Sequence, residues 1–441
     1  MTRLYSAVCR PDLRLLTIAS ALVFMLALLA QLAQGQSFQV IHTFSGSADG
    51  YAPVAGLTLD SSGNFYGTAF VEGTNCPTGC LTAFELSPSG SGWQFQTIYS
   101  SDQSSDGSTP LSRMVFGPDG ALYGSTMYGG NNDCYPGWGC GLVFKLVPSN
   151  GSWTQTAIHR FTGSDGAAPS GDLAFDQAGN LFGTAAGGGL TIGCRGGGCV
   201  GNGVVYKVSN IGGSSSTTTL YKFGSRRVSD GVSPTGGVLI DNYGNLYGTT
   251  ATGGAYGLGS VFELTANGTG WTENVLYSFQ GGADGAVPEG GLVLDNQGHL
   301  YGTTAYNNAA PEGTGVVFAL TSSSGYWSES VLYRFQSGKC SLLTCTTAEG
   351  PRSALVTDAS GNLYGTTVAD GKYGHGSVFK LTRSENGWTY TSLHDFTGGA
   401  DGAAPWGGLS IDSQGDIFGT ASAGGGSSCA GGCGVIFEIT Q

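Results

Sequence analysis

The sequence contains few ionisable side chains. Asp, Glu, Lys and Arg make up only 11% of its 441 residues, and there are only five His. The metalloprotease pattern H-E-x-x-H, the nucleophile elbow G-x-S-x-G and the phosphate-binding loop do not occur. This scarcity of acids and bases argues against an enzyme, and we predict no catalytic residue.

Basic residues are outnumbered by acidic ones. After residue 35 the chain carries 14 Lys and Arg against 29 Asp and Glu, a net charge of −15. Nucleic acids and anionic membranes bind through clusters of Lys and Arg, and the sequence has no such cluster. We therefore expect no nucleic-acid partner, and we interpret the diffuse acidity as a contribution to solubility.

A long apolar run occurs only near the N-terminus. Three Arg precede a 16-residue apolar stretch at 15–30, and small residues follow at 33–35. This order is typical of a secretory signal peptide. A retained membrane anchor is the alternative, although a membrane span needs about 20 residues. We expect residues 1–35 to be a cleaved signal peptide. Residues 36–441 should then form a single secreted domain, extracellular or periplasmic, with no membrane insertion after cleavage.

Helical periodicity is absent after residue 35, and a repeated hexapeptide takes its place. Its copies are GNFYGT at 63–68, GALYGS at 120–125, GNLFGT at 179–184, GNLYGT at 244–249, GHLYGT at 298–303, GNLYGT at 361–366 and GDIFGT at 415–420. An Asp three residues before the first Gly usually forms a hairpin turn with it; in the second copy Gly117 replaces this Asp. A near-constant spacing of 54 to 65 residues indicates a repeat architecture.

Each repeat contains four segments with the composition of β-strands, which we name A to D in chain order. Segment B is the hexapeptide and the residues after it. Segment D often begins with Trp and ends in L-Y-x-F, as at 271–279 and 327–335. Segment A lies at 56–60, 113–117, 172–176, 237–241, 291–295, 354–358 and 408–412. Segment C lies at 83–86, 143–146, 205–208, 261–264, 317–320, 378–381 and 436–439.

The two ends of the chain complement each other. The chain after the signal opens with a D segment at 38–44 and closes with a C segment at 435–439. If the first D segment completes the last repeat, every segment type occurs seven times. We therefore predict an all-β fold, a seven-bladed β-propeller of four-stranded antiparallel blades, closed by pairing of the N-terminal strand with the C-terminal blade. An open β-solenoid is the alternative, but it gives no reason for this match.

The loops between segments D and A carry a G-x-x-D-G-x-x-P pattern. Its Asp-Gly pairs lie at 49–50, 106–107, 165–166, 230–231, 284–285 and 401–402. The sixth copy departs from the pattern, with Glu349-Gly350 and a shifted Pro351. An acidic ring of these residues could bind Ca²⁺ through oxygen ligands. We favour a turn-forming role for each Asp and predict no cofactor.

Ten cysteines follow the signal, and they lie in close pairs. The pairs are Cys76/Cys80, Cys134/Cys140, Cys194/Cys199, Cys340/Cys345 and Cys429/Cys433. Close pairing in an exported chain predicts local disulfide bonds. A structural zinc site is the alternative, but it needs four ligands and each pair falls in a different repeat.

The variable B–C loops and the D–A loops should share one face of the propeller, and four of the cysteine pairs lie in B–C loops. Function often lies on variable loops held by a rigid scaffold, so we take this face as the binding face. Aromatic side chains in these loops could stack on sugars or anchor a protein, although each could also simply pack against its neighbours. The candidate ligand-binding residues are Tyr128, Trp138, Tyr256, Tyr306, Tyr373 and Trp406.

Three functions remain open. The first is a non-enzymatic, monomeric binding module for an extracellular glycan or protein. The second is a carbohydrate-active hydrolase or lyase that uses loop carboxylates. The third is a structural component of a surface or matrix. Acids that break the repeat symmetry and could serve the second function are Glu72, Glu289, Glu312 and Asp370.

Together, the motifs DxxGNLYGTT, GxVFKL, LYxF and GGxDGxxP resemble those of the GloVer-type tandem-repeat family of secreted bacterial proteins, which carry varied C-terminal sorting anchors. The resemblance covers 38–441. It implies export and a propeller-like repeat, and it supplies no activity and no catalytic residues. The chain departs from the family at its end, which has no apolar anchor after Thr440. We therefore expect release rather than tethering.

Overall fold

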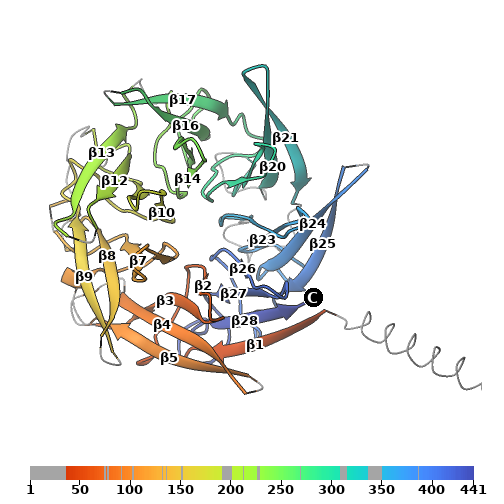
Figure 1. The fold of residues 1–441 in the computed structure, drawn as a ribbon. Helices are drawn as coiled ribbons and strands as arrows, with labels where there is room; N and C mark the ends of the chain where they lie inside the picture. The colour runs from red at the N-terminus through yellow and green to blue at the C-terminus, as the bar shows by residue number, and fades with distance from the viewer. Residues whose placement is uncertain are drawn as a thin grey trace, which may run out of the picture.

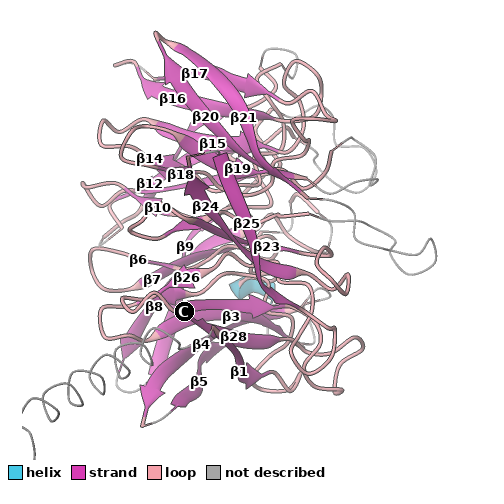
Figure 2. Ribbon diagram, turned by 90° about the vertical axis from the view of Figure 1, so that its right-hand side faces the viewer, coloured by secondary structure: helices cyan, strands magenta, loops and turns pink. Residues whose placement is uncertain are grey.

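The computed structural model shows seven four-stranded antiparallel sheets set radially around one axis (Figure 1). It describes residues 36–441 except 74–75, 77–78, 91, 102–103, 132, 136, 150–151, 191–200, 212, 226–228, 269, 308–314, 336–349 and 386. Each sheet is one blade, and Figure 2 shows the disc of blades from the side. The predicted seven-bladed propeller is therefore confirmed.

The strands of each blade follow the order A, B, C, D from the axis to the rim (Figure 1). The innermost A strands are β2 (Thr58–Leu59), β6 (Val115–Phe116), β10 (Ala174–Phe175), β14 (Leu239–Ile240), β18 (Val293–Leu294), β22 (Val356–Thr357) and β26 (Ser410–Ile411). The B strands are β3 (Phe65–Val71), β7 (Leu122–Thr126), β11 (Leu181–Ala185), β15 (Leu246–Thr250), β19 (Leu300–Thr303), β23 (Leu363–Thr367) and β27 (Ile417–Ala421).

The C and D strands form the outer half of each blade. The C strands are β4 (Cys80–Ser89), β8 (Leu142–Ser149), β12 (Val204–Ser209), β16 (Ser260–Ala266), β20 (Val316–Ser323), β24 (Ser377–Ser384) and β28 (Val435–Thr440). The D strands are β5 (Gly92–Ser100), β9 (Ser152–Arg160), β13 (Ser216–Lys222), β17 (Trp271–Ser278), β21 (Tyr326–Arg334), β25 (Gly387–Asp395) and β1 (Ser37–Thr43). A single turn of 3₁₀ helix, η1 (Ser104–Asp106), interrupts a D–A loop.

The ring is closed by the first strand. β1 pairs antiparallel with β28, with Ser37 opposite Thr440 and Thr43 opposite Val435, and the two strands lie side by side in Figure 1. The last sheet therefore has the order β1-β28-β27-β26. Closure removes the open edge that a linear array of sheets would expose.

The hexapeptide glycine makes room for an aromatic ring of the C strand. Gly365 lies directly opposite Phe379, and a Cβ at Gly365 would lie 2.6 Å from the tip of that ring. The same clash exists in the other blades, as at Gly302 against Phe318. Because the ring is fully buried between blades, the glycine is needed for packing rather than for backbone freedom.

The hexapeptide threonine forms a hydrogen bond to the next blade. In five blades its Oγ1 donates to the backbone carbonyl of the residue just before the A segment of the next blade: Thr184 to Gly236, Thr249 to Gly290, Thr303 to Ser353, Thr366 to Gly407 and Thr420 to Ala55. These hydroxyls are buried, so each bond also satisfies a carbonyl that has no access to water. The repeated G-T ending thus links the blades around the axis.

The sixth D–A loop corrects one prediction. The Gly350 carbonyl accepts from Val368, as the carbonyl of Ala404 accepts from Ser422. Gly350 is therefore the residue before the proline and not the Gly of an Asp-Gly pair. Pro351 keeps the position of the other prolines instead of being shifted, and Glu349 lies outside the described residues.

No helix in the described part of the chain is long and apolar enough to cross a membrane. The predicted signal peptide lies outside the described residues.

Candidate binding site at the propeller axis

In each D–A loop, the chain reaches the axis at a proline. After this proline the chain runs extended into the A strand, so alternate side chains face opposite sides. In the first blade, Ala55 and Leu57 are the second and fourth residues after Pro53, and both are buried. The first, third and fifth residues, which include Val54 and Gly56, therefore face the axis.

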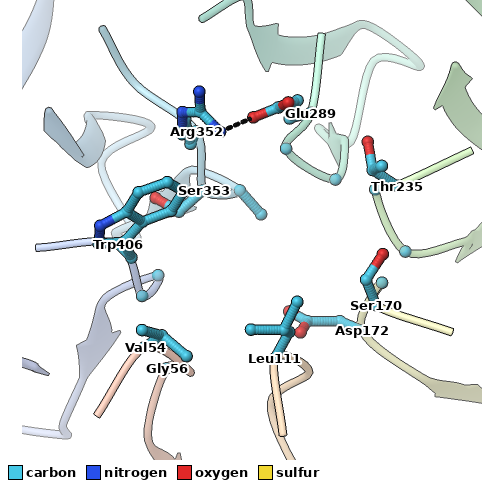
Figure 3. Close-up of a pocket in the computed structure, with 18 residues that line it drawn as sticks. Val54, Gly56, Leu111, Ser170, Asp172, Thr235, Glu289, Arg352, Ser353 and Trp406 are labelled. Carbon is cyan, nitrogen blue, oxygen red and sulfur yellow. Dashed lines mark ion pairs between the residues drawn. The ribbon is translucent and has the colours of Figure 1, made fainter. Parts of the chain in front are cut away.

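The first residues after the prolines surround the axial opening (Figure 3). We call this set the mouth ring. It consists of Val54, Leu111, Ser170, Thr235, Glu289, Arg352 and Trp406. These seven residues are all different, although the frame around them repeats. The ring lines a cavity of about 90 Å³. One water needs roughly 10–15 Å³ on this measure, so the cavity can hold the end of a ligand but not a whole oligomer.

Arg352 is the centre of the most polar part of the mouth ring. Its Nη1 lies 2.7 Å from Glu289 Oε2, an ion pair between neighbouring blades (Figure 3). Its guanidinium lies 4.6 Å from the centre of the Trp406 ring and 5.5 Å from that of Tyr306. Its Nη2 also donates to the Tyr306 hydroxyl. A cation held between two aromatic rings and a carboxylate is fixed in orientation, which favours specific hydrogen bonding to a ligand.

Two hydroxyls complete the opposite side of the mouth ring. Ser170 Oγ and Thr235 Oγ1 are buried, and neither has a hydrogen-bond partner among the residues that the structure describes. Buried polar atoms in proteins usually bond to protein, ordered water or ligand. These hydroxyls therefore provide bonding capacity inside the cavity.

Arg113 and Asp172 close the mouth cavity from below. They are the third residues after two successive prolines, and Arg113 Nε lies 3.8 Å from Asp172 Oδ2. The Arg113 backbone N–H donates to Asp172 Oδ1 at 2.7 Å. The Arg113 side chain passes the axial Gly56 and donates from Nη2 to the Leu409 carbonyl at 3.1 Å. It thus separates the mouth cavity from a second cavity deeper along the axis.

Only two of the predicted aromatic residues meet at the mouth ring. Tyr306 and Trp406 both contact Arg352. Tyr128 and Trp138 instead form a cluster with Tyr135 beside the Cys134–Cys140 disulfide, with Trp138 41% exposed.

The remaining two aromatic candidates lie on separate loops. Tyr256 is 58% exposed and Tyr373 is 50% exposed. The Lys372 ammonium lies 5.0 Å from the Tyr373 ring centre. Neither residue is in the mouth ring.

The candidate carboxylates do not form one group. Glu289 belongs to the mouth ring, Asp370 is buried, and Glu72 is exposed on a B–C loop. Glu312 lies outside the described residues. Sequence reasoning missed Val54, Leu111, Ser170, Thr235 and Arg352. Alignment of the residues that follow each loop proline would have found them as the one position that differs in all seven repeats.

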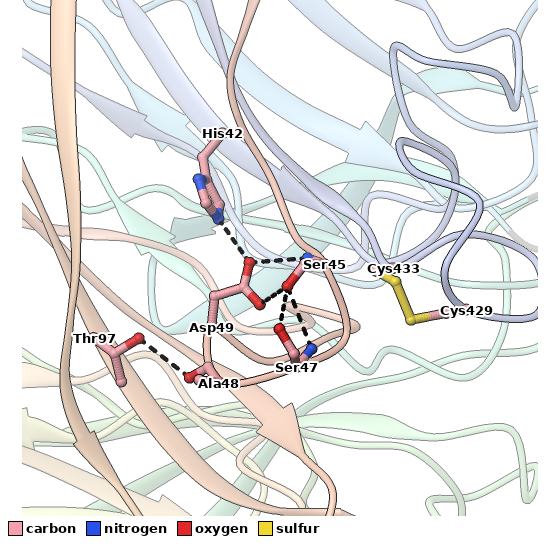
Figure 4. A network of polar contacts seen from close by, with 8 residues as sticks. All are labelled: His42, Ser45, Ser47, Ala48, Asp49, Thr97, Cys429 and Cys433. Carbon is pink, nitrogen blue, oxygen red and sulfur yellow. Dashed lines mark hydrogen bonds and ion pairs between the residues drawn. A yellow bond between two sulfur atoms is a disulfide. The ribbon is translucent and has the colours of Figure 1, made fainter.

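The loop aspartates have bonds within their own blades. Figure 4 shows Asp49, which accepts from His42 and from the Ser45 backbone N–H at 2.8 Å. Asp165 makes equivalent bonds: burial by itself raises its pKa, but hydrogen bonds from His159 and Thr162 lower that pKa to about 2. Each such Asp is a turn-forming residue. Within the described residues, no group of three or more His, Cys, Asp or Glu could hold a metal ion.

Three predicted disulfides are confirmed. They join Cys76 to Cys80, Cys134 to Cys140 and Cys429 to Cys433, and the last appears in Figure 4. Cys194, Cys199, Cys340 and Cys345 lie outside the described residues.

Solved structures with a similar fold are distant in sequence. A luciferin-regenerating enzyme is 11% identical, with 92% of this chain and 96% of that chain covered and a TM-score of 0.42. A protein of unknown function from Dyadobacter fermentans is 13% identical, with coverages of 81% and 98% and a TM-score of 0.43. The NanB sialidase from Streptococcus pneumoniae is 13% identical, with coverages of 91% and 70% and a TM-score of 0.43. These likenesses carry no information about ligand or activity.

A search of curated proteins found no match. The Gloeobacter/Verrucomicrobia repeat, by contrast, matches this chain twice, at residues 22–195 and 192–347. These matches cover most of the chain, and they include the hexapeptides and the loop prolines of the first blades. The chain therefore belongs to the Gloeobacter/Verrucomicrobia repeat family.

Proposed function

We propose that this protein is a secreted, non-enzymatic binding module that takes the end of a neutral glycan into the mouth ring. The observation that carries the proposal is the contrast between a repeated frame and seven different side chains at its opening. A purely structural propeller has no need for such variety at one position. A site that recognises one ligand needs a few different groups, each in a fixed place.

The chemistry of the mouth ring fits a sugar better than an anion. The Arg352 guanidinium is already neutralised by Glu289, so the pair offers hydrogen-bond donors and acceptors without a net charge. Ser170 and Thr235 add hydroxyls that can both donate and accept. Trp406 is half-buried and provides an apolar ring surface for stacking. Ring stacking beside paired donors and acceptors suits a neutral sugar.

A protein partner would need a larger contact area than the mouth ring alone provides. A stable protein interface buries about 800 Å² on each partner. The aromatic cluster around Trp138 could serve such a partner, because it lies on a different part of the same face. Matched variants therefore separate the two kinds of ligand.

The test is a glycan array probed with residues 36–441, followed by titration of the best glycan. We expect Trp406→Ala to weaken binding at least 10-fold, which corresponds to about 1.4 kcal/mol. Trp138→Ala is the matched control and should change binding less than twofold. Both variants should keep the melting temperature of the parent within about 2 °C, because neither ring is among the buried core residues.

Three outcomes would overturn the proposal. One is that the array shows no binding. Another is that Trp138→Ala, rather than Trp406→Ala, abolishes binding. The third is that the protein releases reducing ends from a polysaccharide and Glu289→Gln stops that release, because the protein would then be an enzyme.

A further inference from the structure

A second cavity lies on the axis below Arg113. Its volume is about 640 Å³, within the usual range of 300–1,000 Å³ for small-molecule sites. It shares no lining residue with the mouth cavity. The residues that line it belong to the A segments and are mostly apolar, among them Leu59, Val115, Phe116, Val293, Val356 and Ile411.

The position of this cavity follows from the direction of the A strands. Each A strand runs from the mouth ring toward the A–B turn, as β2 does from Thr58 to the turn at Asp60. The cavity therefore opens on the face of the A–B turns, opposite the mouth ring. A ligand there would not compete with a ligand in the mouth ring.

Arg113 forms the inner end of this apolar cavity. About a fifth of its side chain is accessible, and it lines the cavity. The axial Gly56 and Gly408 make room for it, since a Cβ on them would lie 2.8 Å and 2.5 Å from its nitrogens. A guanidinium has five N–H donors. In the described part of the chain its only hydrogen bond to an acceptor goes to the Leu409 carbonyl, and its Nε has no hydrogen-bond partner.

Arg113 has a partner for its charge, but within the described residues it has N–H donors without an acceptor. Asp172 lies 3.8 Å from Nε, close enough to offset the charge but too far for a hydrogen bond. A ligand at this end of the cavity therefore needs an acceptor atom and does not need a negative charge. An anion would also have to approach Asp172 and to lose its hydration in an apolar channel.

We propose that the lower axial cavity binds a neutral amphiphile, with an apolar body along the A strands and an oxygen atom that accepts a hydrogen bond from Arg113. Apolar cavities in proteins bind apolar molecules even when they are much smaller, since one of about 150 Å³ takes up benzene. The cavity here has room for a chain of several carbon atoms. Arg113 at the closed end sets the orientation of that chain.

The experiment uses residues 36–441 and the fluorescent apolar probe N-phenyl-1-naphthylamine. Decan-1-ol should displace the probe at a concentration at least fivefold lower than decanoate or decylammonium. Val293→Trp fills the cavity and should weaken probe binding at least 10-fold. Val147→Trp is the control, because Val147 is exposed on a C strand, and it should leave probe binding unchanged.

The role of Arg113 has its own test. Arg113→Met should weaken displacement by decan-1-ol at least fivefold and should change probe affinity less than twofold. If Val293→Trp does not fold, Thr357→Trp serves instead, because Thr357 is exposed at the cavity edge. The proposal is wrong if neither Trp variant weakens probe binding, if decylammonium displaces the probe as well as decan-1-ol, or if Arg113→Met leaves displacement unchanged.

Discussion

Two adjacent positions in each D–A loop behave in opposite ways. The second residue after the proline is small and buried, and in five blades its carbonyl accepts the bond from a hexapeptide threonine. The first residue forms the mouth ring and differs in every blade. The frame therefore fixes the backbone at the axis and leaves one side chain per blade free to vary. Changes to the frame should therefore lower stability, and changes to the mouth ring should lower ligand affinity.

The largest effect should come from filling the space beside a hexapeptide glycine. Gly365→Val would place its side chain against Phe379 and Leu355, with the Cβ alone 2.6 Å and 2.9 Å from them. We expect a loss of about 3 kcal/mol in unfolding free energy, at the upper end of the 1–3 kcal/mol that overpacking a core typically costs, because the Cβ alone already clashes with two side chains.

The control for this change is Gly92→Val, because no atom lies within 4 Å of a Cβ at Gly92. That variant should stay within about 0.5 kcal/mol of the parent. Urea midpoints of both variants provide the measurement. Equal midpoints would show that the glycine is not part of the frame.

Loss of a loop disulfide should have the next largest effect. The double variant Cys134→Ala/Cys140→Ala removes a short cross-link and should cost about 2 kcal/mol by the loop-entropy relation. Binding at the mouth ring should persist, because this loop is not part of the ring. Thiol titration of the unfolded, non-reduced parent should find no free thiol in residues 36–441. Two or more free thiols would contradict the predicted pairing of all ten cysteines.

A matched pair of threonines compares frame and mouth ring directly. Thr249→Val removes the buried bond to the Gly290 carbonyl, which should cost about 1–2 kcal/mol because that carbonyl loses a partner. Thr235→Val removes a mouth-ring hydroxyl that has no partner in the described part of the chain and should change stability by at most about 0.5 kcal/mol.

Melting temperatures and glycan titrations should rank the two threonine variants in opposite orders. Thr249→Val should lower stability more, and Thr235→Val should lower glycan affinity more. If Thr235→Val lowers the melting temperature as much as Thr249→Val does, the proposed division between frame and mouth ring is wrong.

The smallest effect should be on the pH dependence of stability, and it comes from Glu329, a carboxylate at the rim whose setting differs from that of Glu289. Glu289 in the mouth ring has Arg352 as a partner. At the rim, burial and the charge of Asp284 raise the pKa of Glu329 to about 7, and Arg334 offsets this only in part. An unfolded Glu has a pKa near 4.3. Between about pH 4.3 and pH 7, the folded protein therefore binds a proton at Glu329 that the unfolded chain does not bind.

Glu329 therefore contributes stability that is present below about pH 4.3 and is lost as the pH rises through about 7. The loss should be about 1 kcal/mol, because the side chain is partly exposed. Melting curves at pH 5 and pH 8 should show a smaller difference for Glu329→Gln than for the parent. Glu385→Gln, at an exposed turn, is the control. An unchanged difference in Glu329→Gln would contradict the prediction.

The fold was predictable because its signals repeat. The hexapeptide fixes the turn and the B strand, and the unmatched segments at 38–44 and 435–439 indicate closure. The A segments were predicted as five-residue strands, but only two residues of each pair with a neighbour, as in β2. The reason is their position: an A strand has no partner on its axial side, and its first residues turn to line the opening.

The site was less predictable because no motif marks it. Its only signal in the sequence is that the residue after the loop proline differs from repeat to repeat. Trp406 was predicted as an exposed aromatic and Glu289 as an acid that breaks the repeat. Arg352, which contacts both, carries no pattern of its own. The sequence also does not reveal that the first residues after distant prolines meet at one opening, since that convergence exists only once the ring is closed.

The pairing that closes the ring also determines how the molecule responds to force. Ser37 lies opposite Thr440, so the two chain ends leave the β1–β28 ladder at the same end. Hydrogen bonds in an antiparallel pair run perpendicular to the strands. A pull applied between the two ends would therefore load one bond at a time, like a zipper, instead of shearing all of them together. We therefore expect the strand pair that closes the ring to open at a lower force than strands loaded in shear, and an attachment through only one end would leave this pair unloaded.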